Sequence, residues 1–152
     1  MRLCLLLFFI AVIAPLSAAQ RTTRTHLRPK QHQKTDTVPS QVHIIPDTAD
    51  FTIAGFNKPL NSLRETFHFS NHLDRTVTEL FITVNYYDTS ERQLHRQSRH
   101  IRWQIPPGET SLISYPSFDR QQSFYYHLSR QPRVKATPFL VTISVDSLAI
   151  IP

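Results

Sequence analysis

The chain has 152 residues, of which 40% are hydrophobic and 18% charged, and this size and composition fit one globular domain with its own core. Its single cysteine, Cys4, argues against a disulfide-stapled scaffold and against thiol chemistry. Seventeen Lys and Arg against eleven Asp and Glu give a net charge of +6, so the location of the basic residues decides what that charge means.

Residues 1–19 have the three parts of a secretory signal peptide. Arg2 gives a positive start, residues 3–13 form an apolar run that Pro15 ends, and residues 17–19 offer small side chains to a signal peptidase. We therefore expect an exported protein, periplasmic or secreted, whose mature chain of 133 residues has no transmembrane segment and no cysteine. The alternative is a membrane anchor made by an uncleaved N-terminal helix, because a span needs about 20 apolar residues and the leader is nearly that long.

Residues 20–40 form a segment that is basic and poor in apolar side chains. Its basic residues are Arg21, Arg24, Arg28, Lys30 and Lys34, and no acid precedes Asp36. Because such a composition cannot bury enough apolar surface to fold, we predict a disordered linker. Its charge predicts a weak attraction of residues 20–35 to anionic lipid headgroups or polysaccharide. The alternative is a solvated leader that binds nothing.

From residue 41 onward, apolar and polar residues alternate with the period of two that is typical of strands. The clearest case is 76–87, where four apolar side chains share one face: Leu80, Ile82, Val84 and Tyr86. This stretch should be a central strand with both faces partly covered. In a shorter case, 65–70, Phe67 and Phe69 share one face. The predicted strands are 41–44, 51–56, 65–70, 76–87, 93–105, 110–115, 124–129 and 139–145.

The predicted strand 93–105 is unusually basic. One parity should face water and consists of Arg96, Ser98, His100 and Arg102. Ile101 and Trp103 fall on the other parity, and Leu94 does not share it. We therefore expect a bulge or a late strand start between Leu94 and Ile101.

A four-residue turn follows this strand at 106–109. Pro107 at its second position and Gly108 at its third predict a type II turn, because proline presets φ and glycine accepts a positive φ.

The stretch 67–112 contains a long strand that ends in Tyr86-Tyr87-Asp88, a polar turn and the later Pro107-Gly108-Glu109. In these features it resembles FxLYD-type immunoglobulin-like domains of exported bacterial proteins. It departs from them after Asp88, where those domains place a glycine and this chain has Thr89-Ser90-Glu91. The stretch 117–126 is similar to short envelope proteins of Bacteroidales-type bacteria. Neither resemblance supplies a catalytic residue.

These patterns predict the organisation of the whole chain: a signal peptide over 1–19, a disordered basic linker over 20–40 and a β-sandwich domain over 41–152. No stretch has helical periodicity of useful length, and about eight strands in roughly a hundred residues are typical of a sandwich. The expected fold class is all-β, an immunoglobulin-like antiparallel β-sandwich of about seven to eight strands.

The sequence offers little support for catalytic or metal-binding groups. His95 and His100 have opposite parity on one strand, so they should point to opposite faces and not share a metal ion. Ser117, Asp119 and His127 supply the residue types of a triad, but the Gly-x-Ser-x-Gly elbow is missing. The eleven acids are scattered, which argues against paired carboxylates. We predict no catalytic residue, no metal and no cofactor.

Aromatic and basic side chains form the more promising surface. In Tyr86-Tyr87 and in residues 124–126, neighbouring rings point to opposite sides of a sheet, so some rings should be exposed. We predict a partner-binding face that consists of Tyr87, Arg96, Arg99, Arg102 and Tyr125. The alternative is that one ring of each group is core and the other packs beneath a loop or forms a hydrogen-bonded corner, as in immunoglobulin-like domains.

The expected function is that of an exported, non-enzymatic binding or assembly module of the bacterial cell envelope, with an envelope protein or polysaccharide as partner. Nucleic acid fits poorly, because an exported chain rarely meets it. The alternative is a small exported hydrolase or inhibitor with its site in the loops 116–122 and 131–138. A pocket around a buried, partnered Asp119 or His127 would favour that alternative, and a flat Tyr/Arg face without a cleft would favour the binding module.

Overall fold

The computed structural model describes residues 40–151. The predicted signal peptide (1–19) and the predicted linker up to residue 39 lie outside this part of the chain, as does Pro152. The strands are β1 (Val42–Ile44), β2 (Phe51–Asn57), β3 (Arg64–Asn71), β4 (Thr76–Tyr87), β5 (Gln93–Ile105), β6 (Thr110–Pro116), β7 (Phe124–Tyr126) and β8 (Thr137–Ile151).

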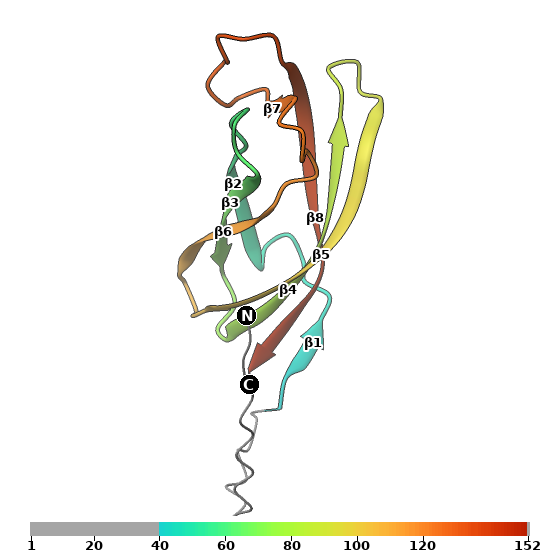
Figure 1. Cartoon of the computed structure of the whole chain (residues 1–152). Helices are drawn as coiled ribbons and strands as arrows, with labels where there is room; N and C mark the ends of the chain where they lie inside the picture. Colours follow the sequence, from blue (N-terminus) through green and yellow to red (C-terminus); the bar gives the residue numbers. More distant parts are fainter. Residues whose placement is uncertain (1–39, 152) are drawn as a thin grey trace, which may run out of the picture. The chain divides into compact units, whose positions relative to one another are not determined.

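The eight strands form two sheets that pack face to face, which confirms the predicted all-β sandwich (Figure 1). The larger sheet has the strand order β1-β8-β4-β5, and β7 pairs with the first residues of β8. The smaller sheet has the order β2-β3-β6. All of these pairings are antiparallel except the short one between β7 and β8.

The strand order resembles that of immunoglobulin domains except at the place of the last strand, G. Immunoglobulin domains place strands A, B and E in one sheet and C, F and G in the other, and the variable type adds C′ next to C. Here β2, β3 and β6 take the places of A, B and E, and β5, β4 and β8 take those of C′, C and F. The place of G beside β8 is filled by β1 and β7, so the first strand of the domain completes this sheet.

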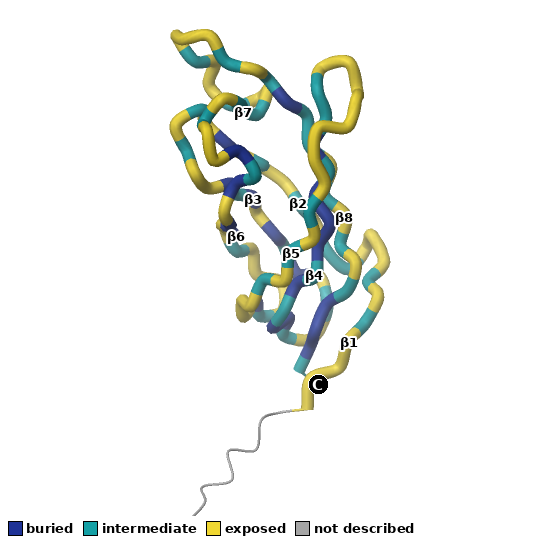
Figure 2. The backbone as a smooth tube through the Cα atoms, turned by 45° about the vertical axis from the view of Figure 1, so that its right-hand side comes forward, coloured by how far each residue is buried: buried dark blue, intermediate teal, exposed yellow. Residues whose placement is uncertain are grey.

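The core lies between the sheets and comes from the inward parities of their central strands. Its fully buried members include Phe67, Phe69, Leu80, Ile82, Val84, Tyr86, Phe139 and Leu148. Figure 2 shows buried positions along the central strands and exposed ones on the loops. Full burial of one such side chain contributes about 1.5–3 kcal/mol. Because a slip of one residue would expose this whole set, the period-two pattern fixes which face of each strand turns inward.

Among residues 40–151, β5 pairs with β4 alone, and the ladder between them is regular over eight residues. Each residue from His95 to Arg102 faces one residue from Tyr86 to Glu79. An irregularity bounds this stretch at each end. At one end Leu94 is an extra residue, which confirms the expected bulge.

The other irregularity places Trp103 and Gln104 together opposite Thr78. The parity of the sequence predicts that Trp103 faces inward with Ile101. Instead Trp103 is 50% exposed, because the irregular ladder interrupts simple alternation and re-aims the side chain.

β7 is shorter and β8 longer than the sequence predicts. β7 ends at Tyr126, whose carbonyl oxygen accepts a hydrogen bond from the Ser129 N–H at 2.8 Å, so the chain turns there. β8 continues past Val145 because Asp146 is an extra residue in the ladder with β4. This polar residue interrupts the apolar alternation and hides the last six residues of β8 from pattern reading.

One turn joins β4 to β5, and another joins β5 to β6 of the small sheet. In the turn between β5 and β6, the Glu109 N–H donates to the Pro106 carbonyl oxygen at 3.2 Å and Gly108 has a φ of 72°, which confirms the predicted type II turn. Within the hairpin turn, Asp88 Oδ1 accepts hydrogen bonds from the Ser90 and Arg92 N–H groups. Glu91 has a φ of 61°, a left-handed conformation that costs a non-glycine residue about 1–2 kcal/mol.

We expect Glu91→Gly to stabilise the domain by roughly 0.5–1 kcal/mol. Relief of the left-handed backbone outweighs the conformational entropy that glycine adds to the unfolded chain. The midpoint of urea unfolding measures this change. Ser90→Gly is the matched control, because Ser90 lies in the same turn without a positive φ and should lose stability. Equal effects of the two substitutions would contradict the assignment of strain to Glu91.

Candidate functional site

The three arginines of the predicted face divide between the two sides of β5. Arg96 and Arg102 are exposed on the outer side of the strand. Arg99 is half-buried on the opposite parity, where its Nη2 donates to Gln97 Oε1 at 2.5 Å and to the Pro116 carbonyl oxygen at 3.1 Å. Arg99 therefore bridges β5 to β6 of the small sheet and does not join the outer face.

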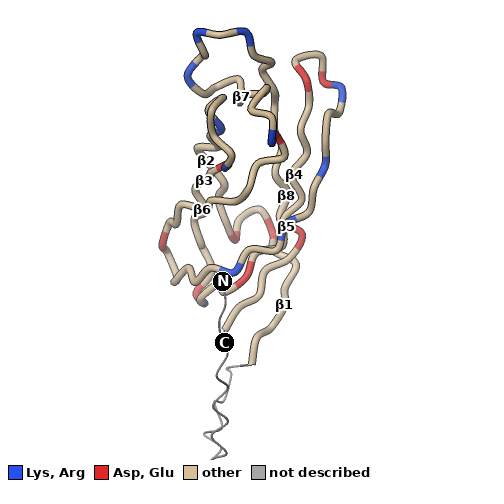
Figure 3. Tube along the Cα trace, in the orientation of Figure 1, with Lys and Arg blue, Asp and Glu red and all other residues tan. Residues whose placement is uncertain are grey.

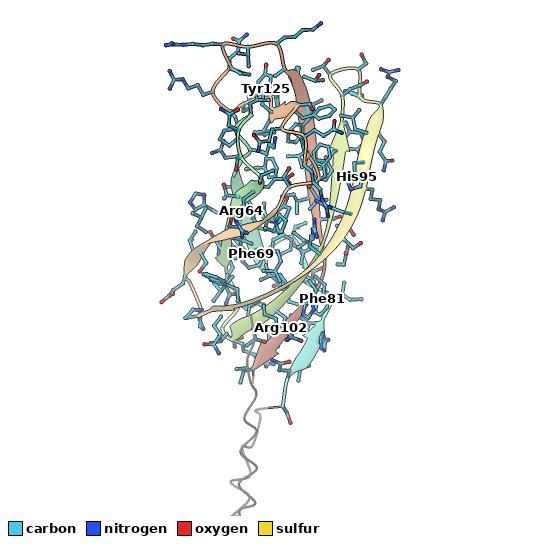
Figure 4. All side chains as sticks on the ribbon, viewed as in Figure 1. Arg64, Phe69, Phe81, His95, Arg102 and Tyr125 are labelled. Carbon is cyan, nitrogen blue, oxygen red and sulfur yellow. The ribbon has the colours of Figure 1, made fainter. Side chains whose placement is uncertain are left out.

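The two predicted tyrosines lie far along the sheet from Arg102. Tyr87 faces Leu140 across the β4–β8 ladder, and Tyr125 faces Pro138 across the β7–β8 ladder. Tyr125 and Arg102 lie near opposite ends of the domain in Figure 4. The five predicted residues thus share one sheet but do not form one compact patch.

Within each group of neighbouring tyrosines, one ring packs in the interior and the other lies toward the surface. This agrees with the alternative interpretation, in which one ring of each group is a core residue. Tyr86 is fully buried, and Tyr126 packs edge-on against Phe56 with ring centroids 4.9 Å apart. Tyr87 and Tyr125 are half-buried on the outer side of the large sheet.

Next to Arg102, the outer side of the large sheet carries an ordered polar and aromatic cluster. Glu79 Oε2 lies 2.7 Å from His100 Nε2, and Glu79 Oε1 lies 3.4 Å from Arg102 Nε. The His100 ring stacks on Phe81 with centroids 4.3 Å apart, and Phe81 also contacts the His43 ring at 5.4 Å. Both carboxylate oxygens of Glu79 are therefore engaged.

β5 is also the long open edge of the domain. Its only ladder among residues 40–151 is the one with β4, so the backbone groups on its other side have no strand partner there. The edge of the small sheet at β6 has seven residues, and β1 and β7 have three each. Figure 3 shows basic residues along β5 and on the loop between β7 and β8.

A buried carboxylate joins the two sheets on the side of β5 and β6. Glu65 of β3 is fully buried. Its Oε2 accepts a hydrogen bond from the Tyr86 hydroxyl at 2.6 Å, and its Oε1 accepts one from Ser117 Oγ at 2.7 Å. Gln97 of β5 donates in turn to the Tyr86 hydroxyl oxygen. The hydrogen-bond network of Glu65 thus connects β3, β4, β5 and the segment after β6.

Two buried polar atoms near Glu65 lack a hydrogen-bond partner among the described residues, the Tyr115 hydroxyl and Arg99 Nε. The Arg99 guanidinium lies over the Tyr115 ring, 5.9 Å from its centroid. Burial, followed by the negative charge of Glu65, raises the pKa of Tyr115 and of Tyr86 far above the ordinary value of tyrosine. Both hydroxyls are therefore held in the protonated form.

A second buried pair ties down the connection between β6 and β7. Lys58 Nζ lies 2.7 Å from Asp119 Oδ2, with side-chain exposures of 0% and 2%, and it also donates to the Phe124 carbonyl oxygen at 2.5 Å. Asp119 accepts further hydrogen bonds from the Ser123 and Phe124 N–H groups. Burial alone would raise the pKa of Asp119, but the Lys58 hydrogen bond and these two N–H groups together lower it.

The three triad candidates do not come together. Ser117 donates to Glu65, Asp119 pairs with Lys58, and His127 is exposed in the turn after β7. A hollow of about 420 Å³ borders the loop 131–138, but none of the three lines it. Residues 40–151 contain no group of three His, Cys, Asp or Glu side chains placed to hold a metal ion. His95 and His100 point to opposite sides of β5 as predicted, the first toward Phe118 and the second toward Phe81.

A hollow of about 680 Å³ opens where β4 and β5 become irregular. It is lined by Gln41, Thr78, Glu79, Arg102, Trp103, Gln104 and Ile151. The sequence pattern did not reveal this site, because Trp103 has the parity of a core residue. Glu65, by contrast, left a readable signal, since an acid shares the inward parity of Phe67 and Phe69.

Comparisons of the chain with protein-family models, with curated proteins and with solved structures give no match. The resemblance to FxLYD-type domains and to Bacteroidales-type envelope proteins therefore stays a prediction. Within residues 40–151, no helix has the length and apolar character needed to cross a membrane.

We expect two of the five tyrosines to resist ionisation until the domain unfolds. Because the pKa values of Tyr86 and Tyr115 are raised in the folded state, the folded domain holds more protons than the unfolded chain above about pH 10, and stability falls as the pH rises beyond that value. Tyrosinate absorbance during an alkaline titration, followed alongside circular dichroism, should show a late step that coincides with unfolding. Ionisation of all five tyrosines in the folded domain would contradict the buried network.

Proposed function

We propose that the chain is an exported, non-enzymatic binding or assembly module of the bacterial cell envelope, which engages a protein partner along the open edge of β5. The observation that carries this proposal is the eight-residue regular stretch from His95 to Arg102, which pairs with β4 on one side only. An unpaired strand edge of this length is a template for an added strand, whose backbone hydrogen bonds supply affinity.

The charge of the edge favours a particular kind of partner. In a continuous sheet made by two copies of β5, pairing centred on Arg99 would place Arg96 opposite Arg102 and the two Arg99 residues opposite each other. Like charges directly opposite are destabilising, so a second copy fits poorly in this register. An extended segment with acidic residues at alternate positions would instead place carboxylates opposite Arg96 and Arg102.

The proposal also includes a role for the basic residues between 20 and 40 at the envelope surface. Their charge supports a role as a spacer or as a weak anchor on an anionic surface. The periplasm or the cell exterior is the proposed location, because the leader has the pattern of a signal peptide.

The buried acids give the hydrolase alternative little support. Asp119 is buried and partnered, but its partner is a lysine and its oxygens are engaged by Lys58, Ser123 and Phe124. Glu65 is likewise engaged at both oxygens. Neither carboxylate lines the hollows described above, so a substrate has no visible route to them.

Affinity capture from an envelope extract tests the proposal with the mature domain and a charge-reversed variant, Arg96→Glu/Arg102→Glu. The control Arg130→Glu/Arg133→Glu makes the same charge change on the loop before β8, away from the edge. We expect a protein captured by the mature domain to be reduced at least about fivefold by the β5 reversal, because the complementary charges become repulsive. The loop control should leave capture unchanged.

Cross-linking should then join the captured protein to residues of β5. Equal capture by the two charge-reversed variants, or cross-links confined to the loops 116–122 and 131–138, would contradict binding at the β5 edge. Circular dichroism of each variant checks that the sandwich is intact.

A further inference from the structure

We propose that the hollow around Trp103 binds an acidic saccharide, a pyranose ring that carries a carboxylate. This site begins at Arg102, the last residue of the regular stretch of β5, and includes the irregularity that follows, and it does not depend on strand addition. The chain has one tryptophan, and the fold leaves it half exposed although its parity and its large apolar ring suit the core.

The irregular ladder is what makes this exposure possible. Thr78 faces two residues of β5, Trp103 and Gln104, so both can turn their side chains into the hollow. Bulges of this kind re-aim side chains and occur often beside binding sites. The next residue, Ile105, is fully buried, so the core continues directly after the irregularity.

The polar groups around the ring suit the rim of a sugar. Gln41 and Gln104 bring amides that both donate and accept hydrogen bonds, and the Gln41 amide is positioned by a 3.3 Å hydrogen bond from its Nε2 to Thr78 Oγ1. Thr78 Oγ1 in turn donates to the Ala149 carbonyl oxygen at 3.1 Å. A pyranose has an apolar C–H face that can lie on the exposed indole and a rim of hydroxyls that can reach these amides.

The charge of the hollow selects an acidic sugar over a neutral one. Among residues 40–151, Glu79 is the only acid that lines the hollow, and its two oxygens are engaged by His100 and by Arg102 Nε. The Arg102 side chain is 80% exposed, so its terminal nitrogens are open to solvent. A guanidinium with both terminal nitrogens available recognises a carboxylate in bidentate fashion, which a neutral sugar cannot match.

The polar lining of the hollow favours a saccharide over a lipid surface. A ring that anchors a protein to a bilayer must reach the headgroup region, whereas Trp103 lies in a hollow with five polar side chains: Gln41, Thr78, Glu79, Arg102 and Gln104. The basic residues that precede Gln41 make an anionic bilayer the main competing explanation, so vesicles form one arm of the test.

The fluorescence of the single tryptophan reports on this hollow directly. We expect trigalacturonic acid, added to the mature chain, to change the Trp103 emission saturably and to bind about tenfold more tightly than the neutral maltotriose. Arg102→Gln should reduce this preference to about twofold or less. The control Arg133→Gln, on the loop before β8, should retain it. Arg96→Glu should also retain it, which separates this site from the proposed β5 edge.

Calorimetry with Trp103→Ala supplies a readout that needs no fluorophore, and it should show binding weakened at least about tenfold. The inference is overturned if trigalacturonic acid at about 10 mM leaves the emission unchanged, or if Arg102→Gln and Trp103→Ala bind it normally. A blue shift with phosphatidylglycerol vesicles, without a response to the trisaccharide, would overturn it in favour of a membrane surface.

Discussion

The one-sided ladder between β4 and β5 is the constraint on which the proposed functions depend. β4 lies in the middle of the large sheet and is fixed by its buried face, so it holds β5 in a single register over eight residues. That register leaves one side of β5 open. It also sends Arg96 and Arg102 outward and Arg99 toward the small sheet, and it ends at the irregularity that exposes Trp103.

The polar interior completes this arrangement from the other side. Glu65 collects hydrogen bonds from β4 and from the segment after β6, while Gln97 and Arg99 connect β5 to the same network. Removal of one partner from such a buried network leaves an unsatisfied group and costs about 1–3 kcal/mol. Hydrogen bonding within this network therefore accounts for these buried charged groups. The side chains that are free to bind a partner or ligand lie on the surface of β5 and at its second irregularity.

Much of the fold could be predicted because burial imposes a period of two on strands. Leu80, Ile82 and Val84 give that signal without interruption, and the bounds of β4 and β5 were accordingly correct. The alternation pattern did not predict the later part of β8. Asp146 shifts the register by one residue and breaks the pattern, but pairing with β4 continues the strand past this break.

The candidate site was harder to predict. Parity alone separates Arg99 from Arg96, but it cannot reveal that Arg99 reaches Pro116 on another sheet. The exposure of Trp103 was likewise not predicted by its parity, because an irregularity in a ladder depends on both strands and the sequence of one strand does not show it.

The most direct test of the account is amide hydrogen exchange of the mature domain, measured residue by residue along β5. An open edge predicts alternation over residues 95–102: amides bonded to β4 exchange slowly, and the intervening ones exchange nearly as fast as in an unfolded chain. Uniformly slow exchange over these residues would show that the edge is already covered in the isolated domain, and it would contradict the proposal that β5 awaits a partner.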